Sequence, residues 1–322
     1  MKRKYILKTL ALMLVTTCVL SGCSKSDSDE PSKTGLGLPS LTGGDTPTDS
    51  TVPTDSTTEG STRFSAETTG DYIAEQEAIR KKVVDNADYY NSIDLSGRME
   101  WCFVRKDDHT PSGTWEQFDI TEYNALYIDK MVSEKVVYLT FDCGFPSTRT
   151  VSILDTLAKH DIKANFFVTK MYLEDCSEYC KRMVEEGHLV CNHSVHHTVM
   201  TDMTVEEIAA EIIDVAEFYY EKTGYTLAPY FRPPTGAYDK RLLTITDDLG
   251  YKTVFWSLAY GDYDQNNQPT VDEVIDHFHK YHHNGAIILM HNDSSANEAA
   301  LDDVLTYMES QGYRFALLDE LE

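Results

Sequence analysis

The sequence has little positive charge. Its 322 residues include 28 lysines and arginines against 53 aspartates and glutamates, which gives a formal net charge of −25 at pH 7. Such a surface repels phosphate backbones and has no electrostatic attraction for anionic lipid, so nucleic acid binding is not expected. An uncharged polymer, such as a sugar chain, is compatible with it.

Cysteines are too few for a disulfide scaffold. The chain has seven, and two of these, Cys18 and Cys23, lie in the N-terminal segment. The other five are an odd number, so at least one lacks a disulfide partner within the chain. Cys176 and Cys180 are one helical turn apart, but nothing nearby completes a metal site, so we interpret them as packing residues.

The chain begins with a short apolar stretch, Ile6 to Leu20, preceded by lysines and an arginine. It is too short to span a membrane comfortably and predicts an export signal over residues 1–22. The sequence Leu20-Ser21-Gly22-Cys23 resembles the lipobox of bacterial lipoproteins. This resemblance implies a lipid on Cys23 that anchors the protein to the outer face of the bacterial cell membrane. The alternative is an ordinary secretory signal with an unrelated cysteine.

Large apolar side chains are almost absent from residues 23–70, which are rich in Ser, Thr, Gly, Pro and Asp. Such a segment cannot bury enough surface to fold, and it predicts a flexible tether. Residues 71–133 predict a helix with Tyr72, Ile79 and Val83 on one face, followed by an irregular lead-in. A regular domain is expected over residues 134–322.

From residue 134 onward, strand-like and helical segments alternate. The expected strands are Val136–Phe141, Ala164–Val168, His188–Cys191, Tyr230–Phe231, Lys252–Leu258, Ala286–Met290 and Tyr313–Leu318. The expected helices are Thr148–His160, Leu173–Glu186, Val205–Lys222, Lys240–Leu249, Val271–His283 and Asn297–Gln311. Capping boxes are predicted at Thr204–Glu207, Thr270–Glu273 and Ser295–Glu298. The alternation predicts an α/β fold with about seven parallel strands in a small, incomplete barrel.

Chemically reactive residues follow five of these strands: Asp142, His193, Arg232, Asp262 and His291. Each has an ordinary explanation when taken alone, such as a turn residue or a satisfied polar group at a strand end. In parallel α/β architectures, however, the ends of the strands meet at one rim, where active sites lie. Together these residues therefore predict one site.

A pair of histidines points to a metal. In His193-Ser194-Val195-His196-His197, the spacing of His193 and His197 lets both imidazoles bind one ion. Surface histidines in a loop are the alternative when the pair is considered alone.

The ordered stretches resemble the five motifs of NodB-like polysaccharide deacetylases, carbohydrate esterase family 4. They are Thr140-Phe141-Asp142-Cys143-Gly144, His193–His197, Arg232-Pro233-Pro234-Thr235-Gly236, Asp262-Tyr263 and Leu289-Met290-His291. The resemblance covers about residues 134–322 and implies the family's distorted (β/α) barrel. Four further segments look most like the branch that makes muramic δ-lactam in the bacterial spore cortex. They are Trp101–Pro111, Phe255-Trp256-Ser257, Asn266-Asn267 and Asn297–Leu301.

The resemblance implies a role for each catalytic residue. Asp142 would be the general base, held ionised by Arg232. His291 would protonate the leaving amine, with Asp262 orienting it.

It also implies the binding residues. His193 and His197 would hold a divalent metal, usually zinc. The backbone N–H of Thr235 would stabilise the oxyanion, Leu289 would line a pocket for the acetyl methyl, and Tyr263 would form part of the wall where a tryptophan is usual.

Cys143 departs from the family pattern, because the third metal ligand is usually an aspartate at this place. Three hypotheses remain open: Cys143 is a third zinc ligand, it forms a disulfide with Cys191, or it is inert.

The expected function is N-deacetylation of N-acetylmuramic acid in peptidoglycan glycan strands, followed by δ-lactam closure. An upstream N-acetylmuramoyl-L-alanine amidase is the implied partner. The alternatives are a deacetylase of another N- or O-acetylated polysaccharide, or a non-catalytic glycan-binding relative that has lost its metal.

Overall fold

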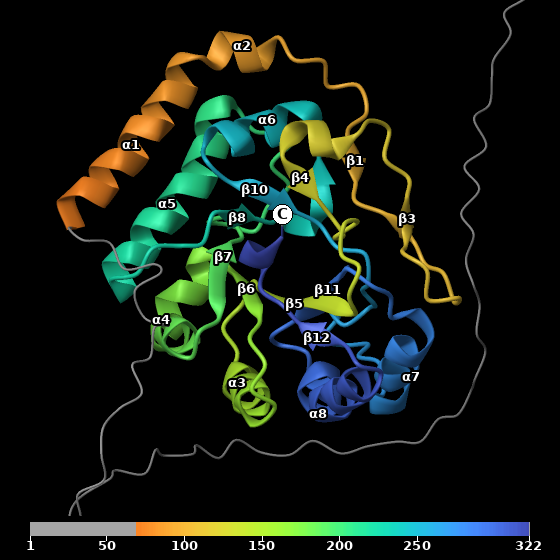
Figure 1. Ribbon diagram of the computed structural model, residues 1–322. Helices are drawn as coiled ribbons and strands as arrows, with labels where there is room; N and C mark the ends of the chain where they lie inside the picture. The colour runs from red at the N-terminus through yellow and green to blue at the C-terminus, as the bar shows by residue number, and fades with distance from the viewer. Residues whose placement is uncertain (1–68, 322) are drawn as a thin grey trace, which may run out of the picture. The chain divides into compact units, whose positions relative to one another are not determined.

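A curved parallel sheet organises residues 69–321, the part of the chain that the computed structural model describes (Figure 1). Its strands follow the order β11-β5-β6-β7-β8-β10-β4, and β12 pairs with β5 beside this path. They are β4 (Ala125–Leu126), β5 (Val136–Cys143), β6 (Asn165–Val168), β7 (Leu189–Asn192), β8 (Tyr230–Phe231), β10 (Lys252–Val254), β11 (Ala286–His291) and β12 (Arg314–Phe315). The export signal, Cys23 and nearly all of the tether lie outside the described residues.

The two ends of the sheet curl toward each other. Beyond β10, Leu258 forms a parallel bridge with Ile288 of β11, and the Leu289 N–H donates to the Leu258 carbonyl at 2.9 Å. The distorted, incomplete barrel is thus confirmed, with all seven expected strands in place. β10 ends at Val254 rather than Leu258, because the chain there leaves its neighbour β8 and turns to β11.

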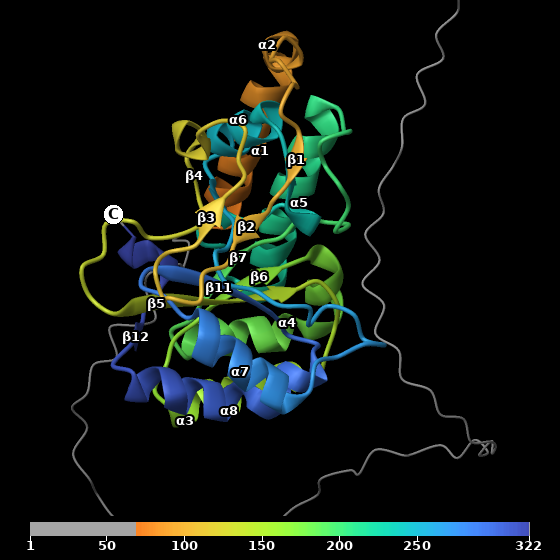
Figure 2. The ribbon, with the colours of Figure 1, turned by 90° about the vertical axis from the view of Figure 1, so that its right-hand side faces the viewer.

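Helices connect the strands and cover the outside of the sheet. They are α3 (Arg149–Lys159), α4 (Lys170–Glu185), α5 (Val205–Thr223), α6 (Lys240–Asp248), α7 (Val271–Tyr281) and α8 (Ser295–Ser310). Figure 2 shows α3, α4, α7 and α8 together on one side of the strands. No helix within residues 69–321 is long and apolar enough to cross a membrane.

Two of the three predicted capping boxes form, at the starts of α5 and α7. The box predicted at Ser295–Glu298 is wrong, because Ser294 caps α8 instead and accepts the N–H of Asn297. The Ser294 hydroxyl also donates to Gln268 at 2.5 Å, which holds this residue in the capping position.

The lead-in belongs to the same compact unit as the barrel. It contains α1 (Thr69–Asp85), α2 (Ala87–Asn91), β1 (Met99–Glu100), β2 (Phe103–Val104) and β3 (Gly113–Thr114). α1 packs on α5, where the ring centroids of Tyr72 and Tyr220 are 5.0 Å apart. β1 pairs antiparallel with β9 (Ala237–Tyr238). β4 pairs with β10 and is an eighth strand of the sheet, which the sequence did not predict. Short 3₁₀ helices lie at Ile120–Tyr123, Pro234–Gly236 and Leu318–Glu320.

Strand β5 passes through the centre of the molecule, and all eight of its residues are buried. Alternate side chains from Val137 to Cys143 join a core cluster with residues of α3, α4 and α8. Because side chains alternate across a strand, Asp142 points to the opposite face, into the barrel. This direction brings Asp142, the one acidic residue of β5, into the candidate site.

Candidate active site

A pocket of about 370 Å³ lies where β5, β8 and β11 end. Residues from several of the predicted motifs line it: Asp142, His197, Pro233, Thr235, Gly236, Trp256, Tyr263, Leu289 and His291. The carboxyl ends of parallel strands thus meet at one site, as the rim argument predicts.

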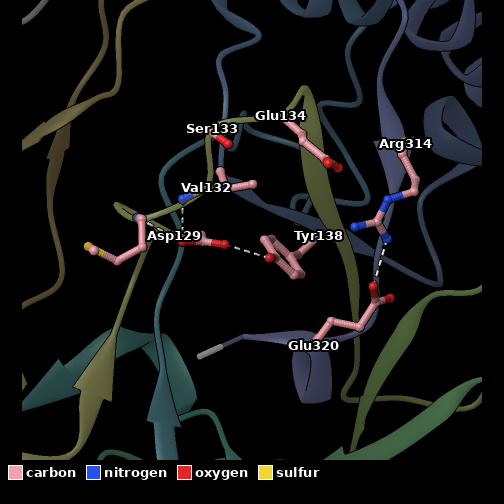
Figure 3. A pocket seen from close by; sticks show the side chains of 8 residues that line it. Asp129, Val132, Ser133, Glu134, Tyr138, Arg314 and Glu320 are labelled. Atoms are coloured by element: carbon pink, nitrogen blue, oxygen red, sulfur yellow. Dashed lines mark hydrogen bonds and ion pairs between the residues drawn. The ribbon is translucent and has the colours of Figure 1, made fainter.

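Another pocket, of about 240 Å³, lies beside the start of β5, at the other end of the barrel (Figure 3). Its main polar groups are already paired with one another. The Tyr138 hydroxyl donates to Asp129 at 2.6 Å, and Arg314 contacts Glu320 at 2.7 Å. Because these polar and charged groups already satisfy one another, we place the chemistry in the larger pocket.

Asp142 is held by a buried arginine. Arg232 Nη1 donates to Asp142 Oδ1 at 2.6 Å and to the Thr140 hydroxyl at 2.9 Å, while its Nε donates to the Val254 carbonyl. Burial raises the pKa of Asp142, but the charges of Arg232 and of nearby histidines outweigh burial, so this pKa lies below its usual value. The carboxylate is therefore ionised and fixed in direction.

His291 has the opposite character. It is the register partner of Asp142 across β11 and β5. Its Nδ1 donates to Asp262 Oδ1 at 2.8 Å, and Asn297 donates to the other Asp262 oxygen at 2.6 Å. Burial lowers the pKa of His291, but the charge and hydrogen bond of Asp262 outweigh it and raise the value to about 9. The imidazole is therefore protonated at neutral pH.

The two predicted metal-binding histidines lie side by side, with ring centroids 4.8 Å apart. His193 Nδ1 lies 2.7 Å from the Arg232 carbonyl oxygen. Since a carbonyl can only accept, Nδ1 carries the proton and donates it. In the neutral ring, Nε2 is then left as an acceptor. Burial lowers the pKa of His193 to about 4 and also lowers that of His197, so both rings are neutral.

These donors fit a divalent metal. His193 Nε2 lies 3.4 Å from Asp142 Oδ2, and two acceptors at this distance require a shared proton or a cation between them. Neutral imidazoles beside a carboxylate are ligands that zinc accepts. Within residues 69–321, however, no group of three or more His, Cys, Asp or Glu is arranged as a complete metal site. His193 and His197 would therefore hold the ion with fewer protein ligands than is usual.

The remaining predicted residues also reach the pocket. Thr235 is exposed there, in the left-handed backbone conformation with φ of 59°. Leu289 is buried in the wall. Tyr263 is 71% exposed at the mouth, with its ring centroid 6.4 Å from that of His291.

Cys143 does not join the site. It points away from Asp142 into the core cluster that also contains Cys176 and Cys180. The hypothesis of a disulfide with Cys191 is contradicted, because both cysteines are free and Cys191 lies in a different cluster. Burial raises the pKa of the Cys143 thiol, which opposes the thiolate that zinc requires. Of the three hypotheses, the structure favours an inert core residue.

Sequence reasoning missed one supporting residue, Glu211. This buried carboxylate accepts the N–H groups of Val195 and His196 and contacts the His196 ring at 2.5 Å. These contacts stabilise the turn that carries the two predicted metal-binding histidines. The only signal in the sequence is an acidic residue between Ile208 and Ile212 on the apolar face of a helix.

Comparisons with known proteins agree with this arrangement. The polysaccharide deacetylase family model matches residues 129–254. The peptidoglycan-N-acetylmuramic acid deacetylase PdaA of Bacillus subtilis is 40% identical over 225 residues, which cover 69% of this chain and 85% of that protein. The structure of PdaA, a family 4 carbohydrate esterase, matches with a TM-score of 0.67 and 39% identity, over 71% of this chain and 98% of that one.

A second relative is described as a pseudoenzyme. The structure of a family 4 pseudoenzyme from Bacillus anthracis matches with a TM-score of 0.57 and 28% identity, over 61% of this chain and 68% of that one. This fold therefore also occurs in a protein described as non-catalytic.

Proposed function

Because the chain belongs to the polysaccharide deacetylase family, we propose that it is a hydrolase that removes the N-acetyl group from N-acetylmuramic acid residues of peptidoglycan. One observation carries the catalytic part of this proposal. Asp142 and His291 are register partners with opposite protonation states at neutral pH. Asp142 is deprotonated and negatively charged, whereas His291 is protonated and positively charged. Amide hydrolysis requires such a base and acid together.

Asp142 acts first, as the general base. It accepts a proton from water while the water oxygen forms a bond to the acetyl carbonyl carbon. The hydrogen bond from Arg232 keeps the carboxylate ionised and directed at the water, and it remains in place when the carboxylate takes up the proton.

The carbonyl oxygen then carries a negative charge. We assign its stabilisation to the N–H of Thr235, an exposed residue that lines the pocket. A metal held by His193 and His197, which we propose is zinc, would polarise the carbonyl and the water when bound. Leu289 offers the acetyl methyl an apolar contact.

His291 completes the reaction as the general acid. It donates its proton to the amide nitrogen as the carbon–nitrogen bond breaks, since an amine anion is too poor a leaving group. Asp262 orients the ring and stabilises its charged form. The products are acetate and a free sugar amine.

The N-acetylmuramic acid assignment rests on the similarity to PdaA. If the peptide stem has already been removed by an amidase, the freed amine and the lactyl carboxyl lie on the same sugar. Their condensation to the δ-lactam, with loss of water, is then intramolecular and correspondingly favoured.

We also propose export and a lipid anchor on Cys23, because the chain begins with a basic, apolar and lipobox sequence. A cell-wall polymer would be reached from the outer face of the membrane. Cys23→Ser should move the protein from the membrane fraction to the soluble fraction, whereas retention in the membrane would contradict lipidation.

The substrate is tested by supplying zinc and following released acetate and lactam muropeptides by mass spectrometry. Peptidoglycan treated with amidase and untreated peptidoglycan are compared, with Asp142→Asn as the control that should lose at least about 100-fold in rate. We expect acetate and lactam from the treated material.

Other outcomes separate the alternatives. Acetate from untreated peptidoglycan alone would contradict the δ-lactam assignment. Acetate only from another N- or O-acetylated polysaccharide would change the substrate. No acetate from any of them would indicate a non-catalytic relative, as in the Bacillus anthracis pseudoenzyme.

A further inference from the structure

A tryptophan of the lead-in, Trp101, contacts two walls of the active-site pocket from behind. Its backbone N–H donates to the Gly236 carbonyl at 2.8 Å, and its indole Nε1–H donates to the Trp256 carbonyl at 2.8 Å. Gly236 and Trp256 line the pocket, whereas Trp101 does not and is only 7% exposed. One residue outside the pocket therefore links two segments that form it.

The first linked segment is the turn that presents the proposed oxyanion donor. Thr235 and Gly236 have φ of 59° and 73°, and the left-handed conformation is costly for a threonine. Such a turn persists only when its surroundings determine it. A Cβ on Gly236 would lie 2.9 Å from the Trp256 ring and 3.0 Å from Trp101 Cβ, so the turn is enclosed on both sides.

The second linked segment leads from the end of β10 to the site. The indole of Trp101 stacks on Phe255, with ring centroids 4.5 Å apart and planes at 16°. The Phe255 carbonyl accepts a hydrogen bond from Arg232, and the Arg232 guanidinium lies 5.7 Å from the Trp256 ring. The position of Trp101 is therefore coupled to the arginine that orients Asp142.

Strand pairing places Trp101 beside Gly236. Met99 and Glu100 of β1 are register partners of Tyr238 and Ala237 of β9, so the next residue of the lead-in faces Gly236. This pairing joins a segment outside the alternating part of the barrel directly to the catalytic turn.

We propose that Trp101 is a positioning residue for deacetylation, which holds the Thr235–Gly236 turn and Trp256 at the spacing that the reaction requires. The inference rests on the proposed function, since it concerns the donor assigned to the oxyanion. Because the oxyanion forms only on the way to the transition state, loosening this turn lowers kcat more than it changes KM.

The test compares three variants of the full chain. Trp101→Phe keeps the backbone N–H and a stacking ring but removes the indole donor. Thr204→Ala removes the cap of α5 and serves as a control for stability alone. Trp115→Phe changes a 69% exposed tryptophan of the same lead-in. The readouts are kcat and KM for acetate release, and hydrogen–deuterium exchange over residues 233–238 and 254–258.

For Trp101→Phe we expect kcat to fall by about 5- to 10-fold, the effect of one lost hydrogen bond, with KM changed less than about twofold. Exchange should accelerate over residues 233–238 and 254–258. Thr204→Ala and Trp115→Phe should leave kcat and the exchange of these segments unchanged.

An unchanged kcat in Trp101→Phe, or a rise in KM alone, would overturn the positioning role. If the unaltered protein releases no acetate, the proposed function fails separately, and the exchange measurement decides the inference alone. Unchanged exchange over residues 233–238 and 254–258 would then refute it.

Discussion

Asp142 and His291 occupy paired positions on adjacent strands, yet their surroundings push their pKa values apart. A buried arginine keeps the carboxylate ionised, and a buried aspartate keeps the imidazole charged. The assignment of base and acid thus follows from one hydrogen-bonded neighbour at each residue.

The pH dependence of the reaction tests this assignment. Deacetylation needs protonated His291, so kcat should fall as pH rises through about 9. Asp262→Asn removes the charge that raises this pKa and leaves burial, which lowers it. The alkaline limb should then move to lower pH, as measured by kcat between pH 6 and pH 10, roughly spanning the reference and raised values.

Asp129→Asn is the matched control, because Asp129 also accepts hydrogen bonds but lies in the pocket at the other end of the barrel. It should leave the alkaline limb in place. The pKa of His291 is raised from 6.5 to about 9 in the folded protein, so its protonation stabilises the fold. This contribution to the free energy of unfolding is complete below pH 6.5 and is lost as pH rises through 9. An unshifted limb in Asp262→Asn would contradict the role of this pair.

Cys143 is expected to act as a core residue. Cys143→Ala should lower the free energy of unfolding in urea by about 1–2 kcal/mol, because it leaves a small cavity between β5 and α4. Zinc content, measured by mass spectrometry, should equal that of the unaltered protein. Loss of the metal in this variant would show instead that the sulfur is a ligand.

At the scale of elements, the register of strand β11 depends on a single backbone position, Gly285. Gly285, just before β11, has φ of 69°, donates its N–H to Val136 at 2.8 Å and accepts from Asp129 at 2.9 Å. β11 carries His291, so this glycine supports the register that pairs the acid with the base.

Gly285→Ala should be severely destabilised. A Cβ there would lie 2.0 Å from the Asp129 carbonyl oxygen, so backbone must move in addition to the strain of positive φ. We expect a loss of at least about 3 kcal/mol in urea unfolding. Gly250→Ala is the control, because φ is 88° but nothing lies within 4 Å, and about 1 kcal/mol should be lost. Equal losses would contradict the steric argument.

At the scale of the whole molecule, the lead-in is part of the catalytic unit. β4 pairs with β10, and Trp101, Ile120 and Tyr127 form a core cluster with Phe255 of the barrel. Removing the lead-in would uncover this cluster and open a strand edge.

Truncation tests this dependence. A chain beginning at Thr69 should fold cooperatively and retain the deacetylase activity of the full protein in detergent-free buffer. A chain beginning at Glu134 should be insoluble or unfolded by circular dichroism, because it lacks β4 and Trp101. A soluble, active chain from Glu134 would show that the barrel folds and works without the lead-in.

The sequence by itself determined the seven alternating strands, most helix caps and the residues that meet at the rim. These features depend on local patterns, namely side-chain periods, capping residues and motif order, which can be seen without knowing any long-range contact. Asp142, His193 and His291 belong to this group.

Tertiary structure alone decided the direction of Cys143, the eighth strand β4, the brace from Glu211 and the contacts of Trp101. Each depends on a partner far away in the chain. Cys143 packs in a core cluster with helices outside the sheet, and β4 pairs with the edge of β10. Glu211 binds the turn before His197, and Trp101 binds Gly236. Short or irregular segments such as β1 and β4 have no periodicity of their own, so only pairing in three dimensions defines them.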